Sequence, residues 1–258
     1  MTNLGGKVAL ITGASSGIGR STAILFAKLG ATLSITGRDI ENLQKTAKEC
    51  EGQGGTSAPL LIQASLDIEE DVKRVVEETI NRFGRLDILV NNAGILERES
   101  IENTSLESYD RVMNINVRSV FQTTSLATPH LIKTKGNIVN VSSVNGIRSF
   151  PGVLAYNMSK SALDQFTKCI ALELAPKNVR VNSVNPGVII SNLHYRAGLT
   201  DEQYEEFLEH SKNTHAIGRP GNPDEVAKCI AFFASSESSF CTGVTMPVDG
   251  GRHAMCPR

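Results

Sequence analysis

The sequence predicts an α/β fold, in which a doubly wound, mostly parallel sheet of about seven strands carries helices on both faces. Two observations support this prediction: short apolar runs alternate with longer amphipathic stretches almost to the end of the chain, and a glycine-rich turn follows the first run. Strand and helix patterns that alternate without a break favour right-handed crossovers between parallel strands. No repeat or linker interrupts the pattern, so residues 1–258 are expected to form a single domain.

The apolar runs are typical of strands buried on both faces of a parallel sheet, because each is short and rich in leucine or β-branched residues. The expected strands are 8–12, 33–36, 60–64, 86–90, 138–141, 179–184 and 244–248. In the stretch 72–83, apolar residues recur at the spacing of one helix face. The expected helices are 39–51, 72–83, 159–174 and 224–234.

Charge and composition argue against several classes of partner. The chain has 27 acidic and 26 basic residues, a net charge of −1, and no long run of one sign, so neither nucleic acid nor an anionic membrane is expected to bind it. No apolar stretch reaches the roughly 18 residues of a membrane span. With 40% hydrophobic residues, the chain has ample material for a core.

The cysteines and histidines predict neither a disulfide framework nor a metal site. The five cysteines are widely spaced without a CxxC pair, and the five histidines have no ligand spacing. Reduced thiols are typical of the cytosol, and no targeting or lipidation motif is recognised at either end. A cytoplasmic location is therefore expected.

The first strand leads directly into the glycine-rich segment TGASSGIG, residues 12–19. A glycine turn between a strand and a helix lets backbone N–H groups approach a pyrophosphate at the positive end of the helix. Glycine is required where a Cβ would block that approach. A glycine cluster alone is weak evidence for a dinucleotide site, but this one precedes a stretch whose apolar residues recur at the spacing of one helix face. The hydroxyls of Ser15 and Ser16 could reach phosphate or ribose.

The end of the second strand bears on the choice of dinucleotide. In dinucleotide-binding folds, an acidic side chain at the end of this strand accepts a hydrogen bond from the 2′-hydroxyl of NAD, whereas a basic side chain binds the 2′-phosphate of NADP. Here Gly37 leaves no acid in the first position, and Arg38 supplies a guanidinium suited to phosphate. The alternative is a solvated Arg38 followed by a helix-capping Asp39, and capping by Asp39 is compatible with phosphate binding by Arg38. The segment predicts a preference for NADP(H), with NAD(H) less favoured.

The most specific constellation is Ser143 followed by Tyr156 and Lys160. Residues four apart share a helix face, so the tyrosine and lysine are expected side by side. A phenol with an ordinary pKa of about 10 is a poor acid or base at neutral pH, and a neighbouring ammonium lowers that pKa. Ser143 ends a strand and could donate a hydrogen bond to a carbonyl oxygen that develops negative charge. YxxxK alone arises by chance in many helices, whereas the serine and the glycine loop make chance a poor explanation.

Two further segments are ambiguous on their own. Asn91-Asn92-Ala93-Gly94 follows the fourth strand, at the edge where ligands gather, but the same letters also form ordinary turns. Residues 191–219 are polar but carry apolar side chains at intervals, which indicates either a lid over a site or a plain surface helix pair. His194 within them is interpreted as ordinary surface rather than as a substrate contact.

These motifs together resemble the short-chain dehydrogenase/reductase family, from KVALITG at 7–13 to VDGG at 248–251. The family's glycine motif matches 12–19, its NNAG segment matches 91–94, and its catalytic asparagine matches Asn116. Its adenine-ring site matches Asp67 and Ile68. The loop that holds the nicotinamide carboxamide matches PGVIIS at 186–191, with Ser191 where threonine is usual.

The resemblance implies a Rossmann-type fold and hydride transfer between a nicotinamide and a carbonyl or secondary alcohol. In it, Tyr156 exchanges the proton, Ser143 polarises the oxygen, Lys160 holds the nicotinamide ribose, and Asn116 anchors a water behind the lysine. The implied cofactor-binding residues are Gly13, Ser15, Ser16, Gly17, Ile18, Gly19, Arg38, Asp67, Ile68, Asn91, Ala93, Gly94, Tyr156, Lys160, Pro186, Gly187, Ile189 and Ser191.

Three functions stay open at this point. The leading hypothesis is an NADPH-dependent reductase of a small lipophilic ketone, because apolar residues gather in 191–219 and beside the site. A 3-oxoacyl-thioester reductase is the rival, and it needs a basic patch, for which Lys133 and Lys135 are thin candidates. A non-catalytic NADP-binding sensor or scaffold is the third. The resemblance also implies a homotetramer.

Overall fold

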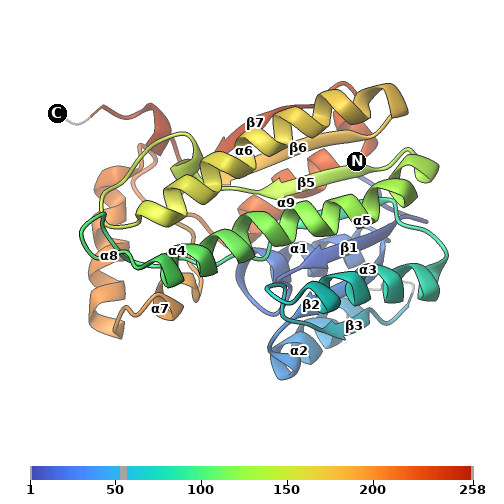
Figure 1. Ribbon diagram of the computed structural model, residues 1–258, viewed down its shortest axis with the longest axis horizontal. Coiled ribbons are helices and arrows are strands. Elements are labelled where there is room, and N and C mark those ends of the chain that lie inside the picture. Colours follow the sequence, from blue (N-terminus) through green and yellow to red (C-terminus); the bar gives the residue numbers. More distant parts are fainter. Residues whose placement is uncertain (1, 53–56, 257–258) are drawn as a thin grey trace.

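The computed structural model, which describes residues 2–52 and 57–256, is built on one seven-stranded parallel sheet in the order β3-β2-β1-β4-β5-β6-β7 (Figure 1). The strands are β1 (Val8–Thr12), β2 (Thr32–Gly37), β3 (Leu60–Gln63), β4 (Ile88–Asn91), β5 (Asn137–Val141), β6 (Arg180–Pro186) and β7 (Thr245–Val248). The seven predicted strands and the doubly wound fold are thus confirmed, with shifts of one or two residues at the ends.

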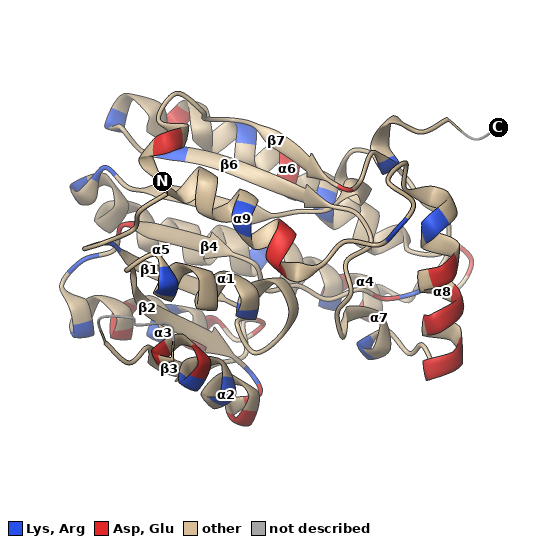
Figure 2. Ribbon diagram, turned by 180° about the vertical axis from the view of Figure 1, so that it is seen from behind, with Lys and Arg blue, Asp and Glu red and all other residues tan. Residues whose placement is uncertain are grey.

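Helices cover both faces of this sheet (Figures 1 and 2). The helices are α1 (Gly17–Lys28), α2 (Ile40–Glu51), α3 (Glu69–Phe83), α4 (Leu106–Met113), α5 (Ser119–Thr134), α6 (Leu154–Leu174), α7 (Leu193–Arg196), α8 (Asp201–Thr214) and α9 (Pro223–Ala234). One apolar core joins α1, α2 and α9 to the sheet through residues such as Phe26, Leu43 and Phe233. The other core lies under α3, α5 and α6 and includes Val75 and Leu131.

Helices α4 and α5 were not predicted, and their sequences explain why. Helix α5 contains Pro129 and is rich in serine and threonine, which compete with the helix for backbone hydrogen bonds. Here the hydroxyls bond back within the helix, as Thr123 Oγ1 does to Ser119 O at 2.7 Å. Between α4 and α5 the chain forms one π-helical turn, η1 (Asn114–Arg118).

The other deviation lies at the start of α6. The sequence predicted a helix from residue 159, but α6 begins at Leu154, so Tyr156 lies in its first turn. No described helix is long and apolar enough to cross a bilayer. The short helices α7 and α8 project beyond the carboxyl ends of the strands, beside the C-terminal segment (Figure 1).

Candidate active site

A cavity of about 780 Å³ lies where the carboxyl ends of the central strands meet α7 and α8. Parallel sheets bind ligands at this edge, where neighbouring connections run to opposite faces. Its floor consists of the glycine loop after β1 and the loops after β4, β5 and β6, and its roof consists of α7, α8 and the C-terminal segment. The predicted lid over 191–219 therefore corresponds to the roof, although its role in substrate binding stays a prediction.

The glycine loop is packed too tightly for side chains. A Cβ on Gly19 would lie 2.3 Å from Gly13 O, and one on Gly13 would lie 2.8 Å from Ala93 Cα. Gly13 also has a φ of +67°, in the left-handed region that favours glycine. The loop thereby brings Ser15, Ser16 and the start of α1 to the cavity wall.

The start of α1 fits a dinucleotide phosphate. Acidic residues occupy the first turns of α2, α3, α8 and α9, whereas the first turn of α1 has none, and its N-cap Ser16 makes no side-chain capping bond. Its first N–H groups therefore face the cavity without an anionic neighbour in their own turn. A phosphate is the kind of ligand that satisfies such groups.

The end of β2 offers the guanidinium of Arg38, whereas its one carboxylate, that of Asp39, is engaged by the next helix. Asp39 Oδ1 accepts a hydrogen bond from Asn42 N at 3.0 Å, so Asp39 caps α2 as predicted. The Asn42 amide also holds the pKa of Asp39 below its usual range. The exposed side chain of Arg38 lines the cavity. A Cβ on Gly37 would lie 2.0 Å from Ser15 Oγ, so a larger residue here would require the Ser15 hydroxyl to rotate away.

The NNAG segment is locked onto β1. Thr12 Oγ1 accepts from the N–H groups of Asn92 and Ala93, both at 3.0 Å, and Asn92 Nδ2 donates to Thr12 O at 2.8 Å. Ala93 and Gly94 line the cavity. Asn91 does not, because its amide points into the sheet and donates to Asn140 Oδ1 at 2.9 Å.

The predicted adenine-ring residues also lie outside the cavity wall. Asp67 is exposed and accepts from Ser65 Oγ at 2.5 Å, and Ile68 is 49% exposed at the N-cap of α3. Ser65 and Leu66 line the cavity in their place. The side chains of this turn that line the cavity therefore precede the two predicted residues.

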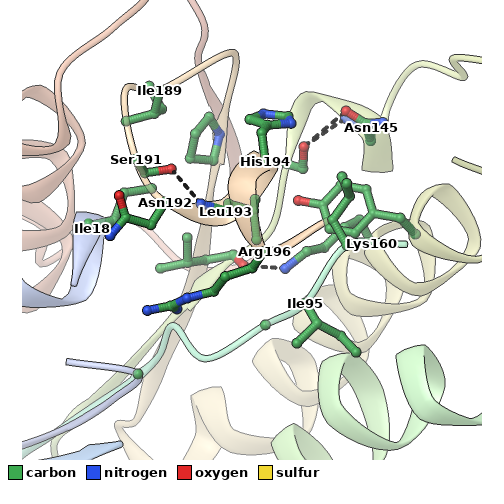
Figure 3. A pocket seen from close by; sticks show the side chains of 18 of the residues that line it. Ile18, Ile95, Asn145, Lys160, Ile189, Ser191, Asn192, Leu193, His194 and Arg196 are labelled. Carbon is green, nitrogen blue, oxygen red and sulfur yellow. Dashed lines mark hydrogen bonds between the residues drawn. The ribbon is translucent and has the colours of Figure 1, made fainter. Parts of the chain in front are cut away.

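Ser143, Tyr156 and Lys160 are brought together at the centre of the floor. All three line the cavity and are buried, each less than a tenth exposed. Lys160 Nζ lies 5.6 Å from the centroid of the Tyr156 ring and donates to Val141 O at 2.9 Å. Ser143 Oγ donates to Asn145 Oδ1 at 3.1 Å, the contact drawn near Asn145 in Figure 3. The predicted shared helix face of the tyrosine and the lysine is present in α6.

The protonation of this group differs from the expectation. Burial raises the pKa of Tyr156 to about 12, and its hydrogen bond with Ser143 acts in the opposite direction. Burial also lowers the pKa of Lys160 to about 8, against the attraction of the Asp164 carboxylate. The lysine was expected to lower the tyrosine pKa, but desolvation dominates here because Tyr156 is almost entirely enclosed by protein.

Asn116 lies beneath this centre, in the π-helical turn η1, and is fully buried. Its Oδ1 accepts from Ile95 N at 2.9 Å, and its Nδ2 donates to Ile95 O and to Ser159 Oγ. The side chain therefore ties the loop after β4 to α6. Single π-turns are frequent at functional sites because they displace backbone groups from the helical ladder.

The loop after β6 is held by a histidine that the sequence analysis did not assign. His215 is buried, its Nε2 accepts from Val188 N at 3.1 Å, and its Nδ1 lies 2.8 Å from Ser211 O. Burial lowers the pKa of His215 and so favours the neutral ring that these contacts require. A Cβ on Gly187 would lie 2.7 Å from His215 Nε2. Pro186, Gly187, Ile189 and Ser191 all line the cavity.

The roof is attached to the floor by few polar contacts. Tyr204 Oη lies 3.1 Å from both the N and the O of Ser191, and Arg196 donates to Ser16 Oγ across the cavity at 3.3 Å. In Figure 3, His194 points toward Asn145 whereas Arg196 extends away from it.

His194 is not ordinary surface, contrary to the prediction. The side chain lines the cavity, and its ring centroid lies 4.3 Å from that of Phe207. Burial, with Arg98 and Arg252 nearby, lowers the pKa of His194 to about 4. The reason for the difference is that α7 turns this residue inward, which spacing along the chain did not reveal.

Comparisons with known proteins agree with this geometry. Residues 13–253 match the family model described as enoyl-(acyl carrier protein) reductase. The chain is 42% identical over 249 residues to the 3-oxoacyl-[acyl-carrier-protein] reductase of Thermotoga maritima, covering 96% of this chain and 98% of the relative. It is 38% identical over 246 residues to the cyclohexanol dehydrogenase of Acinetobacter sp. strain SE19, covering 95% and 94%.

A solved structure matches the fold just as completely. It is the short-chain dehydrogenase/reductase of unknown function from Caenorhabditis elegans, determined with its cofactor. The TM-score is 0.93 at 34% identity, over 98% of this chain and 97% of that chain. The likeness therefore includes the roof helices as well as the sheet.

Proposed function

The chain belongs to the short-chain dehydrogenase/reductase family, and from this premise we propose that it is an NADP(H)-dependent enzyme acting on a small lipophilic ketone or the matching alcohol. Its reaction class is that of its relatives: it is an oxidoreductase acting on CH–OH and C=O groups. The nicotinamide, when bound, supplies or accepts the hydride.

The preference for NADP(H) rests on one observation at the end of β2. Arg38 presents a guanidinium at the cavity wall, while the only nearby acid of that segment, Asp39, is engaged at the start of α2. A 2′-phosphate pairs with an arginine, whereas a free ribose hydroxyl needs a carboxylate. Arg196 at Ser16 adds a second cation beside the glycine loop.

The proposed cofactor site follows the floor of the cavity. The residues we assign to it that line the wall are Gly13, Ser15, Ser16, Gly17, Ile18, Arg38, Ala93, Gly94, Tyr156, Lys160, Pro186, Gly187, Ile189 and Ser191. Gly19 leaves room for the tight glycine turn. Asn91 supports the loop after β4 through its hydrogen bond within the sheet. Asp67 and Ile68 stay predictions from the family match.

The catalytic roles follow from burial and protonation. Tyr156, neutral because its pKa is raised to about 12, donates its proton to the carbonyl oxygen during reduction. Ser143 turns its hydroxyl from Asn145 to that oxygen and stabilises the developing charge. Lys160 holds the ribose hydroxyls and, when charged, favours the phenolate left behind. Asn116 fixes the loop and helix that carry these groups and anchors the relay water.

The proposal of a lipophilic substrate is supported by the apolar residues of the cavity wall. Apolar side chains from both floor and roof line it: Ile95, Leu96, Val144, Phe150, Val153, Leu193, Leu199 and Phe207. Burial of an apolar substrate against such walls contributes about 25 cal/mol per Å².

The second candidate is reduction of a 3-oxoacyl thioester, which the 42% identity to the Thermotoga maritima reductase favours. The basic patch expected for an acidic carrier is not supported. Lys133 and Lys135 lie at the C-terminal end of α5, whereas the catalytic residues gather beyond its N-terminal end.

The test is oxidation of NADPH and of NADH, followed separately, with cyclic and acyclic ketones, steroid ketones, retinal, quinones and acetoacetyl thioester. Turnover of ketones with NADPH supports the proposal. Faster turnover with NADH overturns the assignment of Arg38, and turnover of the thioester alone selects the second candidate. Tight NADPH binding with no turnover of any compound favours a sensor or scaffold.

We also propose a homotetramer in the cytoplasm. Helices α5 and α6 expose apolar side chains, among them Phe121 at 61% and Leu172 at 77% exposure. Light scattering of the purified chain tests this assembly, and a monomeric mass contradicts it.

A further inference from the structure

Two arginines at the substrate end of the cavity have no role in the proposed reaction. Arg98 lies in the loop after β4, and Arg252 opens the short helix η5 (Arg252–Ala254); both line the cavity. The Nε of Arg252 is buried and has no hydrogen-bond partner among residues 2–52 and 57–256. Because this Nε is closed off from solvent, a ligand in the cavity would meet the other end of the guanidinium, its two Nη groups.

Both arginines belong to segments that contact the start of α6, which carries the catalytic tyrosine. The Cζ of Arg252 stands 4.4 Å over the Phe150 ring, and Phe150 O accepts from Asn157, the residue after Tyr156, at 2.8 Å. The loop that carries Arg98 is joined to the start of α6 by Leu154 N, which donates to Glu99 O at 3.1 Å. Both guanidiniums also act on His194 in the roof, where they help to lower its pKa.

Of the three carboxylates near these arginines, two have other partners, whereas Glu99 has a buried Oε2 without a hydrogen-bond partner among the described residues. Glu97 pairs with Arg111 at 3.0 Å. Asp249 accepts from the N–H groups of Gly251 and His253, and its carboxylate lies 3.0 Å from the His253 ring. Glu99 does not line the cavity.

The charges of the cavity wall are therefore unbalanced. Five cationic side chains line it, namely Arg38, Arg98, Lys160, Arg196 and Arg252, against the single carboxylate of Asp39. Asp39 caps α2, and Arg196 contacts the glycine loop, so both belong to the dinucleotide end. A dinucleotide on the floor accounts for Arg38, Arg196 and Lys160. Arg98 and Arg252 are left without an anion in the cavity wall, although the Asp249 carboxylate outside the wall attracts Arg252.

We propose that the substrate is an oxo acid, whose carbonyl lies at Tyr156 and whose carboxylate pairs with Arg252 and Arg98. This inference rests on the proposed function and adds a charged group to the lipophilic ketone. An apolar chain between the two groups contacts Phe150 and Phe207, and the carboxylate faces the Nη groups of Arg252. Guanidinium forks bind carboxylates through paired hydrogen bonds, and stacking on a ring holds the fork in place.

The test compares aliphatic oxo acids of increasing chain length with their methyl esters, using the cofactor that the enzyme prefers. For the best chain length, kcat/KM of the acid is expected to exceed that of the ester about 10- to 100-fold, the range of hydrogen bonds to charged groups. Equal values for acid and ester overturn the proposal. A second comparison uses thioesters of the oxo acids with coenzyme A and with N-acetylcysteamine. A kcat/KM for the coenzyme A thioester above that for the free acid also overturns the proposal.

Variants locate the effect. Arg252→Met and Arg98→Met are each expected to lower kcat/KM for the acid more than for the ester and so to reduce their ratio, and Arg252→Lys keeps part of the ratio. Arg82→Met is the matched control, since Arg82 also stands over a phenylalanine ring, that of Phe83 at 5.7 Å, but lies outside the cavity wall. A ratio unchanged in both cavity variants contradicts the assignment.

Calorimetry separates this inference from the proposed function. If no ketone is reduced, the proposed function fails, but binding of a saturated fatty acid and its methyl ester can still be compared. Binding of the acid alone, weakened by Arg252→Met and not by Arg82→Met, supports the carboxylate site. Equal binding of acid and ester overturns it.

Discussion

The floor and the roof of the cavity are held in different ways. The floor is packed too tightly to admit larger residues, since a Cβ added to Gly19 would lie 2.3 Å from Gly13 O. It is also held by buried hydrogen bonds, such as that from Asn92 N to Thr12 Oγ1. The roof is attached to the floor through hydrogen bonds of the Tyr204, Arg196 and His215 side chains, and the outward side of α8 is acidic and solvated (Figure 2).

This contrast suggests that the floor and the roof have different roles in the reaction. A rigid floor holds the reacting groups within the small tolerances that chemistry requires. A roof with few polar attachments can differ in the side chains that it presents without disturbing that geometry. We therefore expect substitutions in the floor to affect the reaction itself, and those in the roof to affect which substrate is accepted.

The largest expected effect is that of Tyr156→Phe in the floor. Removing the proton donor should lower kcat about 10²- to 10⁴-fold while NADPH binding persists. Tyr109→Phe, a tyrosine of α4 outside the cavity wall, is the control and should keep full activity. Turnover retained in Tyr156→Phe contradicts the role of this residue in the floor.

Gly19→Ala tests the tightness of the floor. The added Cβ must displace Gly13 O or Asn92, so we expect a loss of about 1–3 kcal/mol in unfolding free energy and much weaker dinucleotide binding. Thermal denaturation and fluorescence titration measure the two effects. Gly52→Ala is the control, because a Cβ there lies no closer than 3.6 Å to a neighbour. Equal behaviour of the two variants is the contrary result.

Arg38→Leu tests the dinucleotide end of the floor. Loss of the guanidinium should lower kcat/KM for NADPH about 10- to 100-fold, since a charge-assisted bond to the 2′-phosphate is removed. The value for NADH should change little. Steady-state kinetics with each cofactor gives the ratio, and an equal loss for both cofactors argues against a phosphate contact.

The pH dependence tests the charge in the floor. With a pKa of about 8, Lys160 is cationic below that pH and neutral above it, whereas Tyr156, with a pKa of about 12, keeps its proton throughout. Accordingly, kcat/KM for ketone reduction should be level below pH 8 and fall above it by at most about tenfold per pH unit. In Lys160→Arg the residual activity should show no such fall, because arginine stays charged. A wild-type profile that rises above pH 8 contradicts these assignments.

The smallest effect is expected for Tyr204→Phe in the roof. The change removes the hydroxyl that lies 3.1 Å from both backbone groups of Ser191. We expect KM for the ketone to rise about three- to tenfold, equivalent to a hydrogen bond of about 1 kcal/mol, with kcat almost unchanged. Tyr195→Phe, whose ring stacks on Tyr204 at 4.3 Å, is the control. A fall in kcat without a change in KM would instead mean that Tyr204 affects the reaction itself, as the floor residues do.

The same contrast decides how much the sequence could predict. The floor depends on local spacing, so the strand Val8–Thr12, the glycine turn and the YxxxK pair of α6 were all found from residues close in the chain. Asn91 and Asp67 were placed in the right segments, but the direction of their side chains depends on the sheet and could not be derived from spacing.

The roof depends on contacts between distant segments. Arg252 reaches Phe150, and His215 reaches Val188, through folding that no motif encodes. His194 was assigned to the surface because a lone histidine on a short helix has no periodic signal. Arg252 and His194 enter the inference about the substrate, and only the three-dimensional structure brings them to the cavity.

The central claim is hydride transfer between NADP(H) and a carbonyl carbon, and isotope transfer tests it most directly. NADPH deuterated at the transferring position of the nicotinamide is incubated with the enzyme and the panel of ketones and oxo acids, and the alcohol products are examined by mass spectrometry. The account predicts one deuterium on the carbinol carbon with the wild-type enzyme, and about 10²- to 10⁴-fold slower formation of the same deuterated alcohol with Tyr156→Phe. NADPH that binds tightly while no deuterated alcohol forms from any compound contradicts it.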